Sequence, residues 1–151
     1  MQYSPRSSFT ISQLQVIDWY DGIVVALVRF EEGEGWFLAS LLAWRQDGDE
    51  RVYALVPIGG QFLERMLDVA REGNTKRNWQ EIKKQLARFR NQCTADAIVI
   101  RCRELGARVY AVAEMSLETL GLRAQIGQEV DGAISEERVD IWLSHPALQA
   151  R

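Results

Sequence analysis

Histidine and cysteine are scarce in this sequence of 151 residues, which has His145 as its single histidine and Cys93 and Cys102 as its only cysteines. A tetrahedral zinc site needs four Cys or His ligands, or three and a water, and a Ser-His-acid triad needs a positioned histidine. Two cysteines do not make a disulfide framework. We therefore predict a protein that is not an enzyme, has no metal site and no cofactor, and keeps both cysteines as buried thiols.

Long hydrophobic runs are also absent. The longest uncharged candidate, at residues 35–44, has only ten residues, whereas a helix that spans a bilayer needs about 20. The N-terminal residues do not join a basic region to an apolar one, as a secretory signal would. Hydrophobic residues make up 47% of the chain and charged residues 26%, which are ordinary globular values. We expect a cytoplasmic protein without a membrane partner.

The first half of the chain is rich in strand-forming residues. Three apolar runs, at Ile23–Phe30 and at residues 36–44 and 51–58, are separated by short acidic and glycine-containing turns. Runs of this length and composition favour buried strands, and Asp47-Gly48 is a hairpin signal. With a shorter apolar stretch at residues 14–19, the pattern predicts an antiparallel β-meander.

The pattern changes to helical spacing at Gly59 and returns to strands after residue 95. Residues 61–72 and 75–90 each space their apolar side chains as an amphipathic helix does. Strands are expected again at residues 96–102, 107–113, 127–134 and 138–143, although residues 135–143 could equally form a short helix. We predict an α+β fold with an antiparallel β-meander, two central helices and a C-terminal small β-barrel-like unit. The expected division is 1–92 and 93–151, or one core shared by both parts.

The segment from residue 19 to residue 58 resembles small uncharacterised bacterial proteins that begin with a YDGP motif and a β-meander. The matching stretches are WYDGIVVALVRF, GWFLASLLAW and VYALVPI, with Ile23 where that pattern has proline. The resemblance implies a fold element and carries no known activity.

The segment from residue 96 to residue 142 resembles the small β-barrel of TOBE and molbindin domains. The resemblance follows a hairpin, a short S-x-E-x-LGL helix and a G-x-x-V strand, and its residues are Ser116, Glu118, Leu120, Gly121, Leu122, Gly127 and Val130. It implies a small β-barrel and the binding of an oxyanion such as molybdate. The N-terminal SARN-type loop of that family is replaced here by NQCTADA.

Lysine is confined to the second expected helix, although the chain as a whole carries a net charge of -3. Residues 74–92 hold six basic groups and one acidic group, a sum of +5. At 100° per residue, the apolar side chains of this helix fall on one face. The opposite face gathers six cations, which are Lys76, Arg77, Lys83, Lys84, Arg88 and Arg90.

Three interpretations of this basic face stay open: a solvated surface, a docking face for a protein, and a binding face for nucleic acid. The sequence pI of about 5.3 argues against nucleic acid, because dedicated binders usually have a basic domain. We predict a bacterial binding or adaptor protein whose partner is another protein, an acidic one or a second copy. Trp19 and Tyr20 are candidate anchors. The alternatives are a nucleic-acid-associated protein and a small-ligand or oxyanion sensor.

Overall fold

The computed structural model describes residues 8–19, 22–45, 50–72, 76–106 and 108–118, together with residues 122 and 126. These residues form six strands and two helices. In chain order they are β1 (Ser8–Trp19), β2 (Ile23–Phe30), β3 (Trp36–Arg45), β4 (Glu50–Ile58), α1 (Gly60–Glu72), α2 (Lys76–Gln92), β5 (Ala97–Cys102) and β6 (Arg108–Met115).

The strands close into one barrel in the order β1-β2-β3-β4-β5-β6, and each pair of neighbours is antiparallel. The first and last strands meet through a short ladder in which Phe9 is paired with Val109. The coarse prediction is confirmed: the fold is α+β, with two helices and a small barrel.

Strands from both sides of the expected boundary at residue 92 belong to this barrel. β4 is paired with β5, with Tyr53 opposite Ile100, although both helices lie between these strands in the chain. β5 and β6 therefore complete the barrel that β1 to β4 begin. The strands expected at residues 127–134 and 138–143 lie outside the described residues, as do four residues of the TOBE-like resemblance, namely Leu120, Gly121, Gly127 and Val130.

Near-continuous burial explains the apolar runs of the central strands. Val24, Val25, Ala26, Leu27 and Val28 of β2 are each fully buried, so both faces of this strand are covered. The sequence of a strand in such surroundings is an unbroken hydrophobic run, without the alternation of apolar and polar residues that a half-buried strand shows. β1 is different: its residues Ser12–Gln15 include polar and half-exposed side chains, and its register with β2 shifts beside Gln13.

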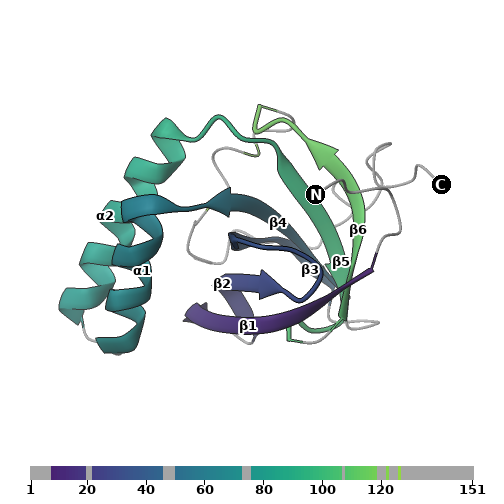
Figure 1. Ribbon diagram of the computed structural model, residues 1–151, viewed down its shortest axis with the longest axis horizontal. Helices are drawn as coiled ribbons and strands as arrows, with labels where there is room; N and C mark the ends of the chain where they lie inside the picture. Colours follow the sequence, from purple (N-terminus) through teal and green to yellow (C-terminus); the bar gives the residue numbers. More distant parts are fainter. Residues whose placement is uncertain are drawn as a thin grey trace.

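The two helices pack against each other as a hairpin at one side of the barrel (Figure 1). Met66 and Val69 of α1 and Ile82 and Leu86 of α2 are buried in the main hydrophobic core. Their spacing of three or four residues gives each helix one apolar stripe. The polar residues on the opposite side of each helix face the solvent.

Candidate functional site

Among the described side chains of the basic face, Lys83, Lys84 and Arg88 are exposed, on the solvent side of α2. Lys76 and Arg77 belong to the first turn of this helix, but their side chains lie outside the described part. Arg90 has different surroundings: it is half-buried, and its guanidinium donates a hydrogen bond of 2.9 Å to the carbonyl oxygen of Ile126. This arginine fastens α2 to a later segment of the chain.

Lys83 and Lys84 occupy different sides of α2. The ammonium of Lys83 lies 5.9 Å from the centroid of the Trp79 ring, which is within the range of a cation–π contact. Lys84 and Arg88, four residues apart, line hollows between the two helices instead. Only these two of the predicted cations with described side chains face α1.

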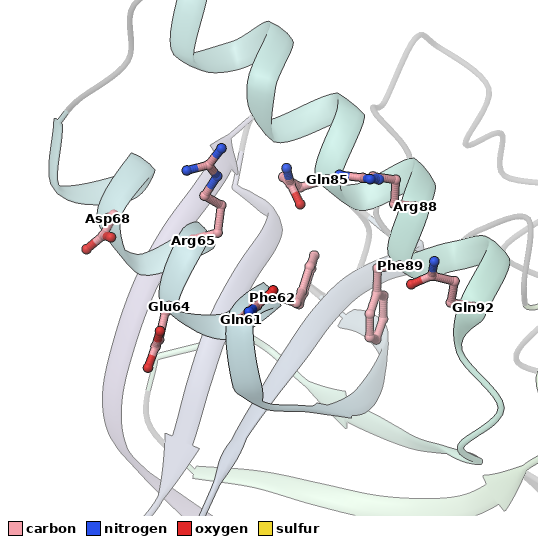
Figure 2. Close-up of a pocket in the computed structure, with 9 residues that line it drawn as sticks. All are labelled: Gln61, Phe62, Glu64, Arg65, Asp68, Gln85, Arg88, Phe89 and Gln92. Carbon is pink, nitrogen blue, oxygen red and sulfur yellow. The ribbon is translucent and has the colours of Figure 1, made fainter.

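A groove of about 630 Å³ runs between α1 and α2 (Figure 2). Two aromatic rings lie within it, Phe62 from α1 and Phe89 from α2, stacked with centroids 4.5 Å apart and planes 16° apart. Both side chains are half-buried, so part of this pair faces the groove. The residues that line the groove are Gln61, Phe62, Glu64, Arg65, Asp68, Gln85, Arg88, Phe89 and Gln92.

A second hollow, of about 700 Å³, continues along the helix pair. It shares Arg65 and Asp68 with the first groove and adds Glu72 of α1 and Lys84 of α2 to its lining. The two hollows therefore form one depression that follows the hairpin from the aromatic pair toward the end of α1. We call this depression the hairpin groove.

An ion pair crosses the hairpin groove. Arg65 of α1 approaches Glu81 of α2 at 3.5 Å, and the Gln85 side chain donates a hydrogen bond of 3.0 Å to the same carboxylate. The Gln85 hydrogen bond and the Arg65 charge hold the pKa of Glu81 below its usual value, against the opposite effect of desolvation. The ion pair links the two helices in the middle of the groove, and the Gln85 hydrogen bond orients the Glu81 carboxylate within α2.

The two walls of the hairpin groove differ in charge once Arg65 and Glu81 are paired. The α1 wall keeps three exposed carboxylates, Glu64, Asp68 and Glu72, and the α2 wall keeps two cations, Lys84 and Arg88. Figure 2 shows the Glu64 and Asp68 side chains directed to the outer side of α1. The hairpin groove therefore has an acidic edge on α1 and a basic edge on α2.

Sequence reasoning missed the acidic wall and the aromatic pair. The three carboxylates recur every four residues, at positions 64, 68 and 72, which places them on one side of a helix. That spacing is visible in the sequence. What the sequence does not show is that this stripe lines the same groove as Lys84 and Arg88 of α2.

Of the two predicted aromatic anchors, Trp19 is described, and it is not among the residues that line the hairpin groove. Trp19, at the end of β1, is 62% exposed, and Tyr20 lies outside the described residues. At the start of β2, the carbonyl oxygen of Ile23 accepts a hydrogen bond of 2.6 Å from the hydroxyl of Tyr53 in β4. Gly22, the residue before β2, has a φ of 131°, and a Cβ there would collide with the Arg51 guanidinium.

Among the described residues, no three His, Cys, Asp or Glu side chains are placed to hold a metal ion. Cys93 and Cys102 are buried thiols, as predicted, and form no disulfide, and burial raises the pKa of the Cys102 thiol to about 12. Cys102 is therefore protonated at neutral pH, and only the thiolate is a good nucleophile.

Neither described helix combines the length and apolarity that a membrane span requires.

Comparison with known proteins gives no relative: no family profile, curated protein or solved structure matches this chain. Both family resemblances seen in the sequence stay predictions. What the groove can do is therefore argued from its geometry and charge.

Proposed function

We propose that this chain is a non-enzymatic binding protein, and that it docks a protein partner in the hairpin groove. The observation that carries the proposal is the groove itself, with an aromatic pair at one end and oppositely charged walls along its length. Helical grooves of this kind accept a helix or an extended segment that supplies apolar anchors and complementary charges.

The aromatic pair supplies the apolar part of this site. Because Phe62 and Phe89 are stacked on each other and only half-buried, a partner side chain placed on them would remove apolar surface from water without a large rearrangement. Aromatic residues in partly enclosed pockets are typical centres of binding energy. The surrounding glutamines, Gln61, Gln85 and Gln92, can accept or donate hydrogen bonds at the rim.

The acidic wall favours a protein over a nucleic acid. A polyanion needs several cations along its path, but Asp68 and Glu72 share a hollow with Lys84, and Glu64 and Asp68 share one with Arg88. These carboxylates would repel phosphate groups. A protein segment with charges of both signs fits both walls.

The test is affinity capture from the native host with three baits: the wild type, the double variant Lys84→Glu with Arg88→Glu, and a matched control. The control, Arg103→Glu with Arg108→Glu, reverses two exposed cations outside the groove. We expect the wild type and the control to retain the same proteins after nuclease treatment, and the groove variant to lose them.

Two results would contradict the proposal. Equal protein recovery by all three baits would show that the groove is only a solvated surface. Recovery that disappears from the wild type after nuclease treatment would show that nucleic acid carries the interaction. Circular dichroism of each bait before capture controls for loss of folding.

A further inference from the structure

We propose that the occupant of the hairpin groove is a second copy of this chain, docked hairpin on hairpin about a two-fold axis parallel to the helices. This inference rests on the proposed function and names the partner. Its basis is that the groove is complementary to itself, in charge and in the position of its apolar end.

Charge gives the first argument. A two-fold interface uses the same surface on both copies, so it is stable only if that surface complements itself. The hairpin groove has an acidic α1 wall and a basic α2 wall. Rotation by 180° about an axis parallel to the helices places α1 of each copy over α2 of the other. Acidic walls then face basic walls on both sides of the axis.

The other face-to-face arrangement fails the same criterion. A two-fold axis perpendicular to the helices and in the plane of the groove places α1 over α1. Glu64 and Asp68 would then face the same carboxylates of the second copy, with Lys84 and Arg88 facing cations. Like charges in contact destabilise an interface, so only the parallel axis is compatible with both walls.

The level of each charge along the helices gives the second argument. The stacked rings show that position 62 of α1 is level with position 89 of α2. Because antiparallel helices advance by the same 1.5 Å per residue, Glu64 is level with positions 87–88, and Asp68 with positions 83–84. An axis parallel to the helices preserves levels. It therefore places Glu64 near Arg88 of the second copy, and Asp68 near Lys84 of the second copy.

These groups are available for such contacts. Among the described residues, Glu64 and Arg88 take part in no ion pair within the chain, and Asp68 has only an exposed pair with Arg71 at 3.8 Å. The symmetry would form each new ion pair twice.

The aromatic pair gives the third argument. Since Phe62 and Phe89 lie at one end of the groove, the parallel axis brings the two aromatic pairs together at the same end of the assembly. The perpendicular axis would place them at opposite ends, each against polar residues. The resulting assembly is a four-helix bundle with antiparallel neighbours, apolar at one end and held by charges along the rest.

Such an interface is polar for a homodimer, so its affinity depends on salt. Exposed ion pairs are screened as ionic strength rises. We expect the dissociation constant of the dimer to increase about tenfold or more between about 0.05 M and about 0.5 M salt. Sedimentation velocity over a range of protein concentrations measures it.

A charge swap tests the arrangement directly. The variant Lys84→Glu with Arg88→Glu has two acidic walls, and the variant Glu64→Lys with Asp68→Lys has two basic walls. We expect each variant alone to sediment as a monomer, and their equimolar mixture to form a heterodimer of wild-type affinity. The control variant, Arg103→Glu with Arg108→Glu, should dimerise as the wild type does.

Three results would overturn the inference: a wild type that is monomeric at every concentration, swapped variants that still dimerise alone, or a mixture that does not recover the dimer. Thermal melting of each variant shows whether loss of the dimer is loss of the fold. A monomeric wild type whose groove still captures host proteins would refute self-docking and leave the proposed function standing. A wild type with neither self-association nor groove-dependent capture would refute both.

Discussion

The barrel and the helical hairpin both contain charged and aromatic side chains, but these side chains have different surroundings in the two regions. In the barrel wall, the Tyr53 hydroxyl is hydrogen-bonded to the carbonyl oxygen of Ile23, and Arg51 lies 5.8 Å from the centroid of the Trp44 ring, although Trp19 and Tyr110 remain exposed. In the hairpin, charged and aromatic groups line an open groove. The comparison indicates that the barrel supplies stability, and that the hairpin presents a surface on which little of that stability depends.

The largest expected effect is in the barrel wall. Leu27 of β2 is fully buried, so Leu27→Ala should lower the free energy of unfolding by about 2–5 kcal/mol, through lost burial and the cavity left behind. Urea denaturation measures this change. Val16→Ala, on the exposed side of β1, is the control and should change the free energy by about 1 kcal/mol or less. Equal losses in both variants would contradict a tightly packed barrel.

A smaller effect is expected from the buried hydroxyl of Tyr53. Tyr53→Phe removes the donor of the 2.6 Å hydrogen bond to Ile23, while an Arg51 guanidinium nitrogen remains 3.4 Å from the same carbonyl. The free energy of unfolding should fall by roughly 1 kcal/mol. Tyr110→Phe, at an exposed residue of β6, is the control. If both variants unfold at the wild-type urea concentration, the bond does not contribute to stability.

The groove cations should matter less for folding. Lys84→Glu with Arg88→Glu changes exposed side chains, so the free energy of unfolding of the monomer should change by about 1 kcal/mol or less. The same variant should abolish docking. A loss of stability as large as that of Leu27→Ala would mean that the groove cations are needed for folding, and the contrast between the barrel and the groove surface would fail.

The smallest effect is a pH dependence in the hairpin. The pKa of Glu81 is lowered in the folded chain, first by the hydrogen bond from Gln85 and also by Arg65. A lowered folded-state pKa contributes stability above the unfolded value of about 4.3, and that contribution is lost as pH falls through the folded pKa. The stability difference between the wild type and Glu81→Gln should therefore shrink as the pH is lowered below about 4. A difference that stays constant with pH would contradict this coupling.

Local patterns of apolar residues predict the individual strands and helices, whereas the barrel architecture depends on strands that pair far apart in the sequence. The run at Ile23–Phe30 is a strand, as expected, and the spacing of residues 61–72 corresponds to α1. Closure of the barrel depends on Thr10 being paired with Arg108, and no local periodicity contains that information. The sequence predicts β1 only from residue 14 because the earlier residues are partly polar, and in the structure the pairing of β1 with β2 is irregular.

The candidate site shows the same division. Helical spacing on its own predicted that Lys84 and Arg88 share the outer side of α2. The acidic stripe and Phe62 belong to a different helix, and their position beside α2 depends on how the hairpin packs. Arg90 was grouped with the exposed cations, yet its guanidinium reaches the Ile126 carbonyl. Helical periodicity places a side chain on a face of one helix and does not report what covers that face.

The most direct test of the hairpin as a protein-docking surface is photo-crosslinking in the native host. A photoreactive amino acid would replace Gln61, which is exposed at the edge of the groove, and in a second strain Arg103, which is exposed between β5 and β6. We predict protein adducts from position 61 and none from position 103, and an adduct of twice the 17.3 kDa chain mass would identify a second copy. No adduct from position 61, or the same adducts from both positions, would contradict the account.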